Sequence, residues 1–67
     1  MKKINVKTNK GDNYTLVYDN GYLYVNHSQG QYVVSNQKQS YEQCINDFQM
    51  TLDITNTEII EWNEIAA

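Results

Sequence analysis

Histidine and cysteine, the side chains that most often supply a base or a nucleophile, occur once each, as His27 and Cys44. His27 ends a predicted strand beside a loop, and no second histidine or acid lies at a spacing that would make it a general base or a metal ligand. Cys44 falls on the apolar stripe of a predicted acidic helix, where a reactive thiolate is disfavoured. We therefore predict a solvated His27, a Cys44 packed in the core, and no catalytic residue.

Three glutamates near the C-terminus, Glu58, Glu61 and Glu64, are the other candidates for acid–base or metal chemistry. On a strand, Glu58 and Glu64 share one side and Glu61 points to the other, whereas on a helix each would neighbour the next. Neither arrangement has companion ligands, so the sequence predicts no metal, no cofactor and no small-molecule substrate. These glutamates are expected to be solvated.

Three tyrosines, Tyr22, Tyr24 and Tyr32, give the strongest indication of function. Tyrosine offers a large, rigid, amphipathic contact area and is enriched in protein interfaces for that reason. Together with Val17 and Val34, they are predicted to lie on the face of a sheet that does not form the core, and these five are the predicted partner-binding residues. Two alternatives stay open: the rings stabilise the sheet as cross-strand pairs, or they form the core because the middle turn is misread.

The tyrosines depend on a predicted four-stranded antiparallel meander. Three glycines each close a short polar loop between runs that alternate apolar and polar residues, and the runs predict strands at residues 3–8, 14–18, 22–27 and 31–35. The first loop, residues 9–11, suits a three-residue hairpin with glycine at the left-handed position. It pairs Ile4 with Leu16 and Val6 with Tyr14.

The middle turn decides which face of the sheet is buried. Asn20 and Gly21 favour a two-residue type I′ turn because both accept positive φ, and this turn pairs Tyr18 with Leu23. A three-residue loop at 19–21 would instead pair Tyr18 with Tyr22 and exchange the faces of the third strand. We choose the two-residue turn.

The third loop is predicted to have three residues, 28–30, because Gln29 is poorly suited to positive φ. It pairs Val25 with Val33. The face predicted to form the core then carries Ile4, Val6, Tyr14, Leu16, Tyr18, Leu23, Val25 and Val33. The other face carries Val17, Tyr22, Tyr24, Tyr32 and Val34, together with Lys3 and Lys7.

A helix is predicted to cover the core face. After a polar linker at residues 36–39, Ser40 and Gln43 have the spacing of a capping box, and the helix is predicted at residues 41–51. Its apolar residues fall on one stripe; they are Tyr41, Cys44, Ile45, Phe48 and Leu52.

Residues 58–63 are rich in β-branched side chains and contain Trp62, so they predict a fifth strand at a sheet edge, with a short second helix as the alternative. The predicted fold is α+β: a four-stranded antiparallel β-meander (residues 3–35) covered on one face by a single helix, with a C-terminal edge strand (β-β-β-β-α-β). At 67 residues, the chain predicts one small domain over residues 1–67.

The charge is unevenly distributed along the chain. Residues 1–38 hold all five lysines and two aspartates, a net charge of +3, whereas residues 39–67 hold six carboxylates and no base, a net charge of −6. The two halves either neutralise each other or form solvated faces, and the alternative is an acidic surface kept free for a basic partner.

These observations support three hypotheses of function. The leading one is a small non-enzymatic protein-binding module of the adaptor or inhibitor type, docking through the tyrosine-bearing face, the acidic helix, or both. The second is a structural homodimer through the second sheet face. The third is single-stranded nucleic-acid binding, in which Lys3 and Lys7 would join the tyrosines, but the net charge of −3 and the lack of arginine oppose it.

Location and origin follow from composition. The single cysteine favours a reducing cytoplasm, and no run of residues predicts a signal peptide or a membrane span. The chain lacks arginine and proline and is rich in asparagine, glutamine, isoleucine, lysine and tyrosine, which favours an AT-rich coding source such as a low-GC bacterium or its phages.

Overall fold

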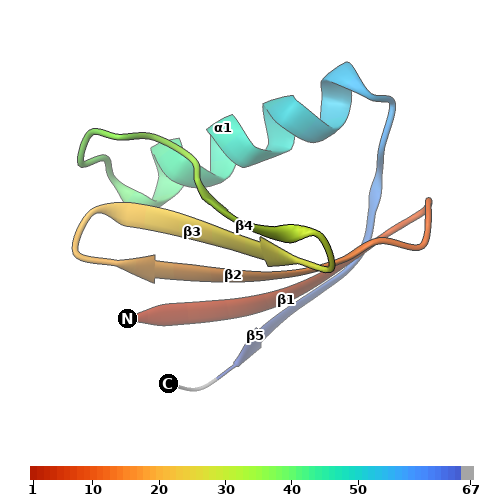
Figure 1. The fold of residues 1–67 in the computed structure, drawn as a ribbon, viewed down its shortest axis with the longest axis horizontal. Helices are drawn as coiled ribbons and strands as arrows, with labels where there is room; N and C mark the ends of the chain where they lie inside the picture. Colours follow the sequence, from red (N-terminus) through yellow and green to blue (C-terminus); the bar gives the residue numbers. More distant parts are fainter. Residues whose placement is uncertain (66–67) are drawn as a thin grey trace.

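The computed structural model describes residues 1–65 as one antiparallel sheet of five strands with one helix on one face (Figure 1). The strand order across the sheet is β4-β3-β2-β1-β5, so the C-terminal strand pairs with the N-terminal one at an edge. This is the predicted α+β fold. The elements are β1 (Lys2–Thr8), β2 (Asn13–Asp19), β3 (Tyr22–His27), β4 (Gly30–Val33), α1 (Tyr41–Ile54) and β5 (Ile59–Ile65).

Helix α1 starts where the sequence predicts and ends three residues later. The Ser40 side chain accepts a hydrogen bond from the Gln43 backbone N–H at 3.2 Å, whereas the Gln43 amide donates to Asp47 at 3.0 Å instead of returning to Ser40. The helix therefore has an N-cap without the second half of a capping box. It continues past residue 51 and ends before Asn56, whose φ of 53° is left-handed.

The first two hairpins have the predicted registers. Ile4 lies opposite Leu16 in the β1–β2 pair, and Tyr18 lies opposite Leu23 in the β2–β3 pair. Asn20 and Gly21 have φ values of 53° and 90°, as a type I′ turn requires. The core face of β3 is therefore the predicted one.

The predicted register of the third hairpin is wrong by one residue. His27 lies opposite Gly30 and Val25 lies opposite Tyr32, so Gly30 begins β4 with a φ of 139° instead of closing the loop. The His27 ring takes part in this tighter turn, because its Nδ1 accepts a hydrogen bond from the Gln29 backbone N–H at 3.2 Å. A shift of one residue exchanges the two faces of a strand.

This shift moves two of the predicted partner-binding residues. Tyr32 lies opposite the buried Val25 on the helix side, and Val34, which follows β4, packs against the core. The prediction that Tyr32 and Val34 lie on the uncovered face is therefore wrong. Val33, predicted in the core, faces the other way and is 40% exposed.

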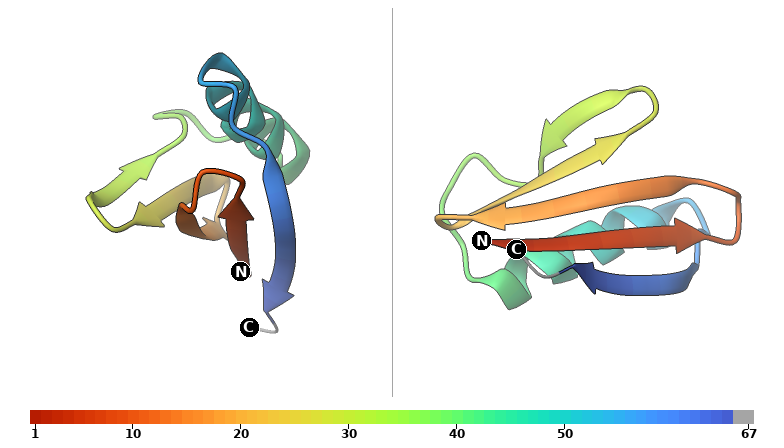
Figure 2. Two further views of the ribbon diagram at one scale, coloured as in Figure 1. Left: turned by 90° about the vertical axis from the view of Figure 1, so that its right-hand side faces the viewer. Right: turned by 90° about the horizontal axis from the view of Figure 1, so that it is seen from below.

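The core lies between α1 and the sheet. Phe48 is fully buried, and the Tyr14 ring packs edge-on against it with centroids 5.6 Å apart. The sheet curves around the helix, so that β4 and β5 lie on its two flanks (Figure 2). The buried apolar side chains are Ile4, Val6, Leu16, Leu23, Val25, Cys44, Phe48 and Leu52.

Cys44 is packed inside this core, as predicted, with 1% of its surface exposed. Burial raises the pKa of its thiol, and the negative charge of Asp47 raises this pKa further, to a smaller extent. Both effects disfavour the thiolate.

We predict that Gly21→Ala destabilises the protein by about 2 kcal/mol and Gly11→Ala by about 1 kcal/mol, because both side chains would need a left-handed backbone. Gly21 has a φ of 90°, and a Cβ there would also lie 3.0 Å from the Cβ of Lys38, whereas a Cβ at Gly11 (φ 83°) meets nothing within 4 Å. Urea unfolding of the two variants measures the difference. Equal losses would show that Lys38 moves away freely.

We also predict that stability falls as the pH rises above about 8.5, the ordinary pKa of a thiol. The pKa of the Cys44 thiol is higher in the folded protein than in the unfolded chain. The contribution of the neutral thiol to the free energy of unfolding is therefore fully present below the unfolded-state pKa and is lost as the pH rises through the folded-state pKa. We expect Cys44→Ala to be less stable than wild type by about 1 kcal/mol at pH 7. Between pH 8 and pH 9.5, its free energy of unfolding should fall by less than that of wild type, because it has no thiol to ionise. Parallel pH profiles in urea unfolding would contradict this prediction.

Candidate functional site

The face of the sheet opposite α1 is uncovered in the described structure (Figure 2). A mostly apolar row of side chains, called the apolar row below, crosses this face. The strand registers place five side chains side by side, one from each strand. Tyr24 and Val17 are half-buried in the row, and Tyr22 lies two residues before Tyr24 on the same face of β3. Three of the five predicted partner-binding residues are therefore on this face. The row runs Ile65, Lys3, Val17, Tyr24 and Val33.

A second row beside it is made of amides and one hydroxyl. Thr15 Oγ1 donates to the side-chain oxygen of Asn5 at 3.2 Å, and the Asn26 amide donates to the Thr15 carbonyl at 3.3 Å. Sequence reasoning missed this row, because its members come into line only when the registers of all five strands are known. The amide row runs Asn63, Asn5, Thr15, Asn26 and Gln31.

A third row carries charge and bears on the nucleic-acid hypothesis. Lys7 pairs with Glu61 on the neighbouring strand, with Nζ and Oε2 3.4 Å apart. Both side chains are exposed, so the pair adds little stability. It does neutralise one of the two lysines that the sequence placed beside the tyrosines, which leaves Lys3 in the apolar row.

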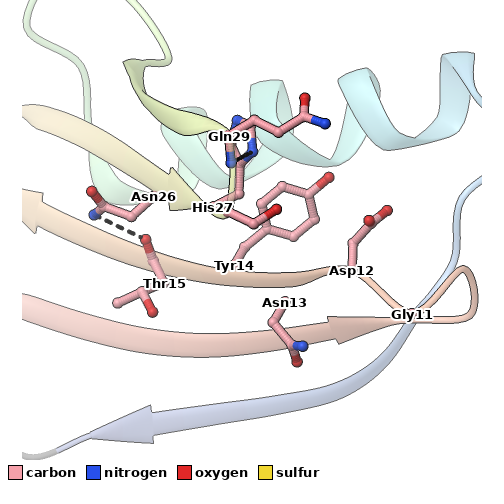
Figure 3. Close-up of a pocket in the computed structure, with 9 residues that line it drawn as sticks. Gly11, Asp12, Asn13, Tyr14, Thr15, Asn26, His27 and Gln29 are labelled. Atoms are coloured by element: carbon pink, nitrogen blue, oxygen red, sulfur yellow. Dashed lines mark hydrogen bonds between the residues drawn. The ribbon is translucent and has the colours of Figure 1, made fainter.

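A recess of about 700 Å³ lies at one end of the sheet, where β2 and β3 part beyond the pairing of Thr15 with Asn26 (Figure 3). The loops that precede β2 and follow β3 form its sides. Asp12 and Tyr14 point to the helix side of β2, and Asn13 points to the opposite side. The recess therefore opens through the split between the strands.

His27 lies in this recess and is half-buried, so the prediction of a solvated histidine is only partly right. Its ring packs edge-on against Tyr14 and Tyr32, with centroids 5.8 and 6.2 Å away. Burial first, and then the charge of Asp12, raise the pKa of Tyr14. Within residues 1–65, no hydrogen bond or ion pair joins His27 to a carboxylate, and no three candidate ligands cluster as a metal site would need.

Another surface with large exposed apolar groups lies between α1 and β4. Met50 and Ile54 on the helix are 60% and 81% exposed, and Tyr32 on the strand is 39% exposed. With Val34 and Asp47, they line a hollow of about 270 Å³. Tyr32 and Val34 thus belong to this second surface and not to the open face.

No protein-family model, no curated protein and no solved structure matches this chain significantly. Among residues 1–65, no helix has both the length and the apolar character that crossing a membrane requires.

Proposed function

We propose that this chain is a small non-enzymatic protein-binding module, of the adaptor or inhibitor type, that docks through the open face of its sheet. The observation that carries the proposal is the apolar row of Val17, Tyr24 and Val33, which crosses the face that no element of residues 1–65 covers. Tyrosine is enriched at the centres of protein interfaces, and Tyr24 lies half-buried between the half-buried Val17 and the exposed Val33.

The surroundings of the row support a protein partner. The amide row beside it supplies directional donors and acceptors, as the polar rim of an interface does. A nucleic-acid strand would need free cations, but Lys7 is paired with Glu61 and the chain has a net charge of −3. The single Cys44 supports the reducing cytoplasm as the place of action, and the composition supports a phage or mobile-element origin.

A structural homodimer is the second candidate, and the α1–β4 hollow is the observation that favours it. Exposed Met50 and Ile54 would be unusual on an isolated surface helix, and a two-fold mate could cover them together with Tyr32. This surface differs from the open face, so the two candidates can be separated by substitution.

We predict that the Tyr24→Ser variant no longer captures the partner protein and that the Tyr32→Ser variant still captures it. Loss of a central interface tyrosine costs about 2 kcal/mol, or roughly thirtyfold in affinity. The measurement is quantitative capture from a lysate of the source organism by wild type and by each variant, with thermal melting to show that both variants fold. A folded Tyr24→Ser that captures the same proteins at wild-type levels would refute docking through the open face.

Sedimentation of the same proteins between 1 and 100 μM tests the homodimer. We expect Met50→Lys to dissociate any dimer that forms over the α1–β4 hollow, and Tyr24→Ser to leave it intact. A dimer that only Tyr24→Ser dissociates would instead place the open face between two copies of this chain.

A further inference from the structure

Strand β5 is an edge of the sheet with its outer side unpaired among the described residues. Antiparallel residue pairs alternate between exchanging two hydrogen bonds and exchanging none. The Thr8 N–H donates to the Asp12 carbonyl, so the even-numbered residues of β1 turn their backbone groups to β2 and the odd-numbered residues turn theirs to β5. The β5 residues opposite the odd-numbered residues of β1, such as Asn63, therefore direct their backbone groups toward β1. The N–H and C=O groups of Trp62 and Glu64, which alternate with them, point outward from the edge of the sheet.

A groove runs beside this edge, between α1 and β5. Two recesses of about 430 and 380 Å³ lie end to end along it. Their helix residues are 41, 42, 45, 46, 49, 52 and 53, which form one stripe at helical spacing. The stripe spans about 18 Å along the helix, and residues 59–64 span about 17 Å along the strand. The groove thus matches the length of about five residues of extended chain.

Helix α1 makes its closest backbone contacts with β3, three strands away from β5 in the sheet order. The floor of the groove is apolar: Ile45, Ile59 and Trp62 are half-buried and pack against the edge of the core. Trp62 presents an indole ring to the groove and backbone groups to the open edge. A strand added to β5 would therefore place every second side chain over this floor.

Charge decides what kind of strand fits. Four of the six carboxylates of residues 39–67 line the two recesses, and no lysine lines either one. Nearby lysines have other partners: Lys2 lies over the Tyr41 ring at 4.3 Å, and Lys10 donates to the Thr55 carbonyl. A second copy of this chain would bring eight such carboxylates together, whereas a basic segment would neutralise them. The four groove carboxylates are Glu42, Asp53, Glu58 and Glu64.

We propose that β5 and the groove beside it bind an extended basic polypeptide segment. The segment adds to the sheet as a sixth strand, antiparallel to β5 like every other pair of neighbouring strands, and its lysines or arginines, at every second position, lie over the groove against these carboxylates. This is strand addition at a free sheet edge, with main-chain hydrogen bonds for affinity and alternate side chains for specificity. It does not depend on docking through the open face.

The test uses an eight-residue peptide of alternating lysine and valine with blocked ends. A residue paired with Trp62 through backbone hydrogen bonds has its side chain on the same face as Trp62, so lysines over the groove also turn their N–H groups to β5. We expect N-methylation of the lysines to weaken binding at least tenfold and N-methylation of the valines to leave it unchanged. Hydrogen exchange should slow at the amides of Trp62 and Glu64 on binding.

Two charge variants with the same net charge provide the matched control. The double variant Glu42→Gln/Glu64→Gln removes two groove carboxylates and should weaken peptide binding about fivefold, the size of two exposed ion pairs. The double variant Asp47→Asn/Glu61→Gln changes two carboxylates outside the groove and should bind as wild type. The Tyr24→Ser variant should also bind as wild type, because Tyr24 lies on the open face.

Four outcomes would overturn the proposal. The first is that the peptide does not bind at low salt. The second is that the two N-methylated peptides bind equally well, because antiparallel strand addition requires the lysine amides. Equal weakening by the two double variants would show nonspecific charge attraction. Protection of the Trp62 and Glu64 amides that rises with protein concentration, without peptide, would make the occupant a second copy of this chain.

Discussion

The two-residue turn at Asn20 and Gly21 is the constraint on which the rest of the structure depends. It pairs Tyr18 with Leu23, which places the aliphatic side chains of β3 beneath the helix and its tyrosines on the open face. The same turn anchors the start of α1, because the Gln39 N–H donates to the Gly21 carbonyl at 2.8 Å and the Tyr18 hydroxyl donates to Gln39 at 2.7 Å. One local conformation thus fixes both the buried face and the position of its cover.

One helix is too narrow to cover five strands. A helix with its side chains is about 10 Å wide, whereas five strands span about 19 Å from first to last. Placed nearest to β3, α1 leaves a hollow along each flank and leaves the opposite face bare. Exposed Met50 and Val33 follow from this geometry. A chain of this size therefore has apolar surface that its own elements do not cover, and partner binding is one way to cover it.

The sequence predicted the fold class, the element order and two of the three hairpin registers, because period-2 and helical patterns are local signals. All eight buried apolar residues were predicted in the core, whereas the predicted core residues Tyr14, Tyr18, Tyr41 and Ile45 are half-buried and Val33 is exposed. The third register was missed because a two-residue loop was expected to need a positive φ at Gln29, whereas neither Ser28 nor Gln29 has one in the structure and His27 pairs with Gly30. Tyr32 and Val34 were misplaced for that reason. The amide row and the α1–β5 groove join residues from up to five elements, so no local pattern could reveal them.

The sheet itself explains why the opposite charges of the two halves of the chain remain apart. Lys3 and Lys7 alternate out of β1 to the open face, whereas Glu42 and Glu64 lie on the helix side. Neutralisation then occurs only where a carboxylate shares the open face, as Glu61 does with Lys7. Within residues 1–65 this is the single lysine–carboxylate pair. Lys2 is the exception, because it lies on the helix side over the ring of Tyr41, which lines one recess of the groove. It contacts this ring and forms no ion pair within residues 1–65, so the groove carboxylates have no lysine partner there.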